Sequence, residues 1–180
     1  MVCVAMPPLP AALRIGVTGH RSHRIADPTL IQACAAEVLA QVCASVAAVV
    51  AVGGSAFSMS PPRLRLVSCC ADGADLILAE AAIVAGFRLD MILPFAAELY
   101  TRVFPPNDRD RVLSLSRDLA TASVLVLEDA GDPPDPLRIN AAYLAAGRLM
   151  LDHLDILVTV WDGLPQRGGG RHCADGRRGP

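Results

Sequence analysis

Short apolar runs alternate with longer segments in which apolar residues recur every three or four positions. The short runs are typical of buried strands and the longer segments of helices. The predicted strands are 13–19, 63–69, 88–95, 123–127 and 154–161, and the predicted helices are 27–52, 72–86, 105–120 and 136–150. Strands that alternate with helices form right-handed crossovers and a parallel sheet. We therefore predict an α/β fold, a Rossmann-like three-layer α/β/α arrangement with a mostly parallel, doubly wound sheet.

The same pattern predicts one domain, over residues 13–170, because no repeat or linker interrupts it. Residues 1–12 form an N-terminal extension and residues 171–180 an irregular tail. The 180-residue length suits a single domain with a full core.

Two apolar segments carry expectations about burial. Leu30–Val52 is long enough to raise the question of a membrane span, but Gln32, Glu37 and Gln41 interrupt it. We therefore predict a largely buried helix of a soluble protein and no membrane partner. Leu154–Trp161 is almost continuously apolar, which is typical of a strand covered on both faces.

The composition of the chain argues against several kinds of partner and location. The net charge of −2 argues against a general DNA-binding surface, although all 16 basic residues are Arg. The six cysteines form no C-x-x-C pair, so we expect buried thiols in a reducing cytoplasm and no metal site. Met1–Pro10 has no basic n-region, so we expect no secretory signal.

The candidate chemistry begins where the first predicted strand ends, at Gly16-x-Thr18-Gly19-His20-Arg21. Glycines allow backbone N–H groups to approach a phosphate. The hydroxyl of Thr18 can donate a hydrogen bond to it, and the guanidinium of Arg21 can bind it in a bidentate manner. The third glycine of a dinucleotide fingerprint is missing, so dehydrogenase chemistry is not expected. A tight turn with solvated His20 and Arg21 remains the alternative.

Two further turns follow strand ends. Gly73 and Asp75 come after the second predicted strand, where Asp75 either contacts a ligand or only stabilises a helix start. Gly169 and Gly170 come after the last strand, where a glycine run suits a second phosphate cradle.

Four sequence segments together resemble the SLOG superfamily, the Rossmann-like group that includes DprA and the LOG proteins. They are Ile15-Gly-Val-Thr-Gly-His-Arg21, Ser68–Asp75 with Ala79-Glu80-Ala81-Ala82, Leu93-Pro94-Phe95 with Tyr100, and Asp155-Ile156-Leu157 leading into Val160-Trp161-Asp162-Gly163. The resemblance implies a nucleotide site in which the first glycine turn and a later Gly-Gly-Thr turn face one phosphate. LOG members are phosphoribohydrolases, other members are thought to sense nucleotides, and DprA binds single-stranded DNA.

The chain departs from this pattern after Gly170, where the resemblance implies Thr, then a helix and a further strand. It reads Arg171-His-Cys-Ala-Asp-Gly-Arg-Arg-Gly-Pro180 instead. One choice of synonymous codons for this tail encodes Gly-Gly-Thr-Ala-Gln-Met-Val-Ala-Glu-Ala when read one base later. We therefore expect a truncated or out-of-frame C-terminus. An authentic tail would leave strand five uncovered, with low solubility or a compensating partner.

These observations favour a nucleotide-binding SLOG-type domain, a sensor or other cytoplasmic protein, without a cofactor. The alternatives are a phosphoribohydrolase, a DprA-like DNA-binding module and a degenerate, inactive fragment. For the hydrolase, the candidate carboxylates are Asp75, Glu80 and Glu98, and none matches the LOG signature. DNA binding is disfavoured by the net charge, and a homodimer stays open.

Overall fold

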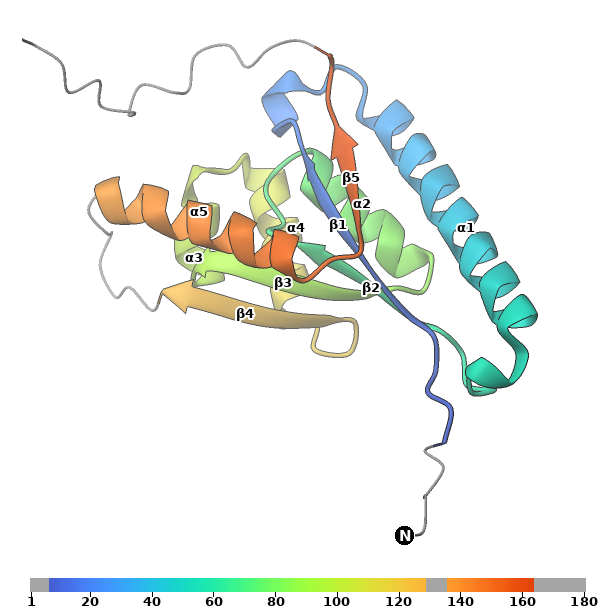
Figure 1. Ribbon diagram of the computed structural model, residues 1–180. Coiled ribbons are helices and arrows are strands. Elements are labelled where there is room, and N and C mark those ends of the chain that lie inside the picture. Colours follow the sequence, from blue (N-terminus) through green and yellow to red (C-terminus); the bar gives the residue numbers. More distant parts are fainter. Residues whose placement is uncertain (1–6, 129–135, 164–180) are drawn as a thin grey trace, which may run out of the picture.

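The computed structural model describes residues 7–128 and 136–163. They contain a five-stranded, all-parallel sheet with the strand order β4-β3-β2-β1-β5 (Figure 1). The strands are β1 (Ala12–Gly19), β2 (Arg63–Ser68), β3 (Arg88–Phe95), β4 (Ala122–Glu128) and β5 (Ile156–Val160). The predicted α/β class and the Rossmann-like arrangement are therefore confirmed.

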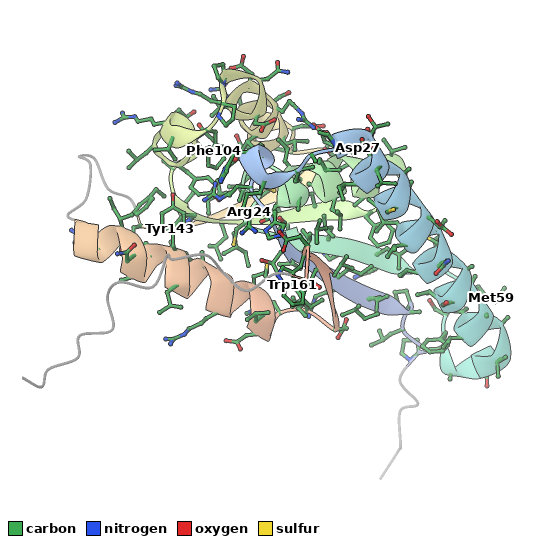
Figure 2. All side chains as sticks on the ribbon, turned by 90° about the horizontal axis from the view of Figure 1, so that it is seen from above. Arg24, Asp27, Met59, Phe104, Tyr143 and Trp161 are labelled. Carbon is green, nitrogen blue, oxygen red and sulfur yellow. The ribbon has the colours of Figure 1, made fainter. Side chains whose placement is uncertain are left out.

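Helices join the strands and cover both faces of the sheet. They are α1 (Pro28–Gly53), α2 (Ala74–Val84), α3 (Ala97–Tyr100), α4 (Pro106–Arg117) and α5 (Pro136–Asp152), with short 3-10 turns at Ser22–Arg24, Gly54–Ala56 and Thr101–Val103. Viewed from above, α5 lies on one face of the sheet and α1, α2 and α4 lie on the other (Figure 2). The chain progresses from β1 to β4 and then returns to β5 on the other side of β1. The direction of winding thus reverses at β1.

Local signals place several element ends as the sequence predicts. The Asp27 side chain accepts a 3.0 Å hydrogen bond from the backbone nitrogen of Leu30, and Pro28 occupies the first helical position. Gly86 has φ +87° just after α2, a conformation that glycine adopts without strain.

The core has two parts, mainly on opposite faces of the sheet, although the larger part also includes Ala142 of α5. The larger part includes Ile15 and Val17 of β1 and Leu39 of α1. The smaller part, under α5, joins the four buried residues Val67, Ile92, Ala146 and Met150. Alternate residues of each strand therefore serve opposite faces.

Helix α1 is much more exposed than its apolar sequence indicates. Its only buried residues are Ala35 and Leu39, whereas Leu30 is 58% and Val52 90% exposed. The predicted largely buried helix is therefore wrong, because α1 packs through one narrow side only. By length and composition, Pro28–Ala56 could cross a membrane, with a mean hydropathy of 2.0. The absence of a membrane partner stays a prediction.

Strand β5 also differs from expectation, because it is an edge strand. Ile156 and Leu157 are exposed, and the predicted burial of Leu154–Trp161 on both faces is wrong. The reason is topological: β5 pairs with β1 on one side only, and α5 packs on β3 and β4 instead. Within the described residues, β5 therefore keeps an uncovered apolar surface.

Candidate functional site

A cavity of about 430 Å³ lies where the winding of the sheet reverses, at the carboxyl ends of β1 and β5. It is lined by Thr18, Gly19, His20, Arg24, Thr159, Val160 and Trp161. In open parallel sheets, ligands bind at such a reversal because the connecting helices diverge there and leave a crevice. Arg24 and Trp161 mark this edge of the sheet in Figure 2.

Asp162 contacts both basic side chains of the cavity, Arg24 and His20. Its carboxylate lies 2.7 Å from Nη2 of Arg24 and 3.2 Å from Nε2 of His20. The backbone nitrogen of Asp162 also lies 3.2 Å from Nε2 of His20, so His20 finds a partner there whether its Nε2 donates or accepts. The backbone nitrogen of His20 donates a 3.2 Å hydrogen bond to the carbonyl oxygen of Val160. These contacts fix the turn after β1 on the end of β5.

The remaining walls offer a hydroxyl group and an aromatic surface. Thr18 projects from the exposed end of β1, on the face that also carries Gly16. Trp161 is the one tryptophan of the chain, and it is 65% exposed. A cavity with a guanidinium, an imidazole, a hydroxyl and an indole can bind an anion that carries an apolar, planar group.

Arg21 does not line this cavity but is held in a separate cluster of aromatic residues. Its guanidinium forms an ion pair with the nearly buried carboxylate of Asp72. Its Cζ atom lies 5.3 Å from the centre of the Phe104 ring, a distance typical of a cation–π contact. Tyr100 packs on both Phe104 and Tyr143, with ring centres 4.9 and 5.8 Å apart. The charge of the Arg21 guanidinium is therefore already compensated within the protein, by Asp72 and Phe104.

Asp75 lies in the first turn of α2 and is 7% exposed. The backbone nitrogen of Ala71 donates a 3.4 Å hydrogen bond to its carboxylate. Burial raises the pKa of Asp75 to about 7. The same effect raises the pKa of the Cys69 thiol to about 12 and that of the buried Cys70 further. The expectation of buried thiols is wrong for Cys34, which is exposed on α1.

The glycines of the predicted phosphate turns have close neighbours in the protein itself. A Cβ on Gly19 would meet the Cβ atoms of Ala74 and Val160 within 2.8 Å. A Cβ on Gly16 would overlap the side chain of Leu154. Close packing therefore suffices to explain both glycines, and their contact with phosphate stays a prediction.

Gly73 likewise packs against protein. It has φ +96°, and a Cβ there would lie 2.5 Å from the backbone nitrogen of Ser22 and closer still to the carbonyl oxygen of His20. Gly169 and Gly170 lie outside the described residues, so the second phosphate turn stays a prediction.

The other carboxylates that the sequence offers are paired with arginines away from the cavity. Arg111 binds both Glu80 and Asp108, and Ser22 Oγ donates a 2.5 Å hydrogen bond to Asp108. Glu98 is exposed and lies 3.1 Å from Arg117. Among the described residues, no group of three or more His, Cys, Asp or Glu side chains is placed to hold a metal.

The structure thus brings Thr18, Gly19 and His20 together in one cavity and places Arg21 and Asp75 outside it. The sequence offers only weak signals for the other residues that line the cavity, such as Arg24. Arg24 lies one helical turn beyond Arg21, which gives it no motif of its own.

Comparison with known proteins adds no closer assignment. No family model matches the chain, and no curated protein matches it in sequence. The class that the fold defines is a Rossmann-like parallel α/β protein.

Proposed function

We propose that this protein binds a nucleotide or nucleotide derivative at the carboxyl ends of β1 and β5, as a sensor domain of SLOG type. The observation that carries the proposal is the cavity at the reversal point of the sheet, which combines Arg24 and His20 with the exposed indole of Trp161. A phosphate group alone would use only the basic side chains. A nucleotide also has an aromatic base, which can stack on the indole of Trp161.

Each group has a defined part in the proposed complex. The guanidinium of Arg24 and the hydroxyl of Thr18 donate to phosphate oxygens. The base stacks on Trp161, a contact worth about 1–3 kcal/mol in nucleic-acid binding proteins. Asp162 neutralises Arg24 in the free protein, so the phosphate has to displace this carboxylate.

A phosphoribohydrolase is the weaker candidate, because it needs a carboxylate beside the anomeric carbon of the ligand. Among the described residues, those that line the cavity include no carboxylate, and the carboxylate of Asp162 at its edge is paired with Arg24 and His20. Asp75 is buried in the adjoining turn, and Glu80 and Glu98 are paired with arginines elsewhere.

The single tryptophan makes the proposal directly measurable. We expect AMP, ADP-ribose, NAD or a cyclic nucleotide to change the fluorescence of Trp161 in a saturable way. Arg24→Ala should weaken that ligand about tenfold, since it removes one charge-assisted hydrogen bond. The matched control is Arg117→Ala, which breaks an exposed ion pair with Glu98 outside the cavity and should leave affinity unchanged.

Ligand fragments separate the two halves of the proposed site. Ribose 5-phosphate should bind more weakly than AMP and leave the indole emission nearly unchanged, because it has no base. An unchanged signal across the whole panel overturns the proposal. Release of free adenine from AMP would instead establish the hydrolase, and single-strand DNA binding with a steep salt dependence would establish a DprA-like role.

A further inference from the structure

The outer face of α1 carries one continuous stripe of exposed residues. These are Leu30, Cys34, Glu37, Gln41, Ser45, Ala48 and Val52, and each of them is exposed. Their spacing of three or four residues places them on one side of the helix. The buried residues Ala35 and Leu39 lie on the opposite side, against the core. Figure 1 shows α1 along the outer edge of the molecule.

The polar and apolar positions of this stripe are arranged symmetrically about Gln41. The polar residues Glu37 and Ser45 flank Gln41 four positions away on either side, and the apolar residues lie beyond them. An antiparallel copy of α1, centred on Gln41, therefore matches the stripe layer by layer. The layers are Leu30 with Val52, Cys34 with Ala48, Glu37 with Ser45, and Gln41 with its own counterpart.

The chemistry of each layer is complementary. Two glutamine amides can exchange hydrogen bonds. The hydroxyl of Ser45 donates to the carbonyl oxygen of Gln41 at 2.9 Å within its own helix and would have to rotate to donate to Glu37 of a second copy. Glu37 is the one charged residue between Pro28 and Gly53, and in this register it does not meet its own copy. No like charges therefore oppose the contact.

The C-terminal apolar end of the stripe adjoins a groove. A groove of about 430 Å³ lies at the C-terminal end of α1, lined by Ala48, Val49, Val52, Gly53 and Phe57. In the antiparallel register, Leu30 of a second copy would lie opposite Val52, one of the residues that line this groove. Because the contact is repeated by symmetry, two such groove contacts form at once.

We propose that a second copy of this chain docks on α1, with the two helices antiparallel about a twofold axis at Gln41. A lipid surface explains the stripe less well, because it would leave the side chains of Glu37 and Gln41 without partners in hydrocarbon. The antiparallel pair gives each of these polar groups a partner and also covers the apolar ends.

The oligomeric state tests the proposal. Sedimentation equilibrium of the full chain should give twice the monomer mass of 18.9 kDa. Gln41→Arg places two like charges on the axis and should weaken the dimer at least tenfold. Ala47→Arg is the matched control, because Ala47 is exposed on the same helix but lies off the stripe. Circular dichroism should show both variants folded. A monomer at all concentrations, or equal effects of the two variants, overturns the proposal.

Cysteine cross-linking tests the orientation of the helices. Gln41→Cys should form a disulfide with its own copy under mild oxidation, because the axis brings these positions together. The native Cys34 should not pair with itself, because two copies lie about 20 Å apart along the helices in the antiparallel register. Cross-links are mapped by mass spectrometry. A Cys34–Cys34 link would show a parallel pair, and flotation of the monomer with anionic lipid vesicles would show a membrane-surface helix. Either result overturns the proposal.

Discussion

The backbone nitrogen of Ala74 donates a 3.0 Å hydrogen bond to the carbonyl oxygen of His20 and so joins the turns after β2 and β1. This contact is close because Gly73 has no side chain. The cavity wall at His20 therefore depends on a glycine that does not itself line the cavity.

Gly73→Ala should destabilise the protein by about 2–3 kcal/mol, because it combines a strained positive φ with a clash against backbone atoms. Gly86→Ala is the control, since its φ is +87° but a Cβ there meets no atom within 4 Å. It should cost about 1 kcal/mol. Urea unfolding compares the two variants, and equal losses would show that crowding at Gly73 is unimportant.

Arg21→Met should destabilise the protein by about 1–3 kcal/mol, because it leaves the nearly buried carboxylate of Asp72 with only the 3.2 Å hydrogen bond from the backbone nitrogen of Ser22. The double variant Arg21→Met/Asp72→Asn should recover part of this loss. Thermal unfolding of the four proteins in the cycle measures the coupling. Strictly additive losses would mean that the ion pair contributes nothing measurable.

Asp75→Asn should become more stabilising, relative to the parent, as the pH rises from about 4 to 7. The pKa of Asp75 is raised from 3.8 to about 7 by burial, so the folded state keeps a proton that the unfolded chain loses. The free energy of unfolding of the parent therefore falls over this range, and asparagine removes that dependence. Melting temperatures between pH 4 and pH 8 provide the measurement.

Asp118→Asn is the control for this pH dependence. Hydrogen bonds from Thr121 and Ala120 lower the pKa of the exposed Asp118, so its stabilising contribution is lost as the pH falls below 4. Between pH 4 and pH 8 the difference between Asp118→Asn and the parent should therefore stay nearly constant, unlike that for Asp75→Asn. A flat difference for Asp75→Asn would mean that this carboxyl is ionised normally in the fold.

Asp162→Asn should strengthen nucleotide binding about fivefold, because it removes the carboxylate that competes with phosphate for Arg24 and His20. The emission of Trp161 reports the affinity. Glu128→Gln breaks the ion pair of Glu128 with Arg138 outside the cavity and should have no effect. Weaker binding by Asp162→Asn would show that Asp162 organises the site and does not compete for it.

The order of strands and helices could be predicted from sequence because it depends on local periodicity and on end signals such as Asp27 and Gly86. The exposure of α1 and β5 could not. The sequence of an apolar segment is the same whether or not another element covers it. In this fold, β5 stays uncovered because α5 packs on β3 and β4.

The candidate site divides in the same way. Thr18, Gly19 and His20 follow one strand directly, so topology alone predicts their place at the carboxyl edge. The direction of Arg21 depends on Asp72, which is distant in sequence and reaches it only through the fold.

The position of β1 between β2 and β5 has a consequence for the order of folding. One edge of β1 pairs with β2, the next strand in the sequence. The other edge pairs with β5, where Ile156 is opposite Ile15 although the two residues are far apart in the sequence. Closing so long a loop is slow compared with forming neighbouring contacts. The cavity shared by β1 and β5 should therefore be among the last parts to assemble, and a ligand that binds it would stabilise the finished state and slow its reopening.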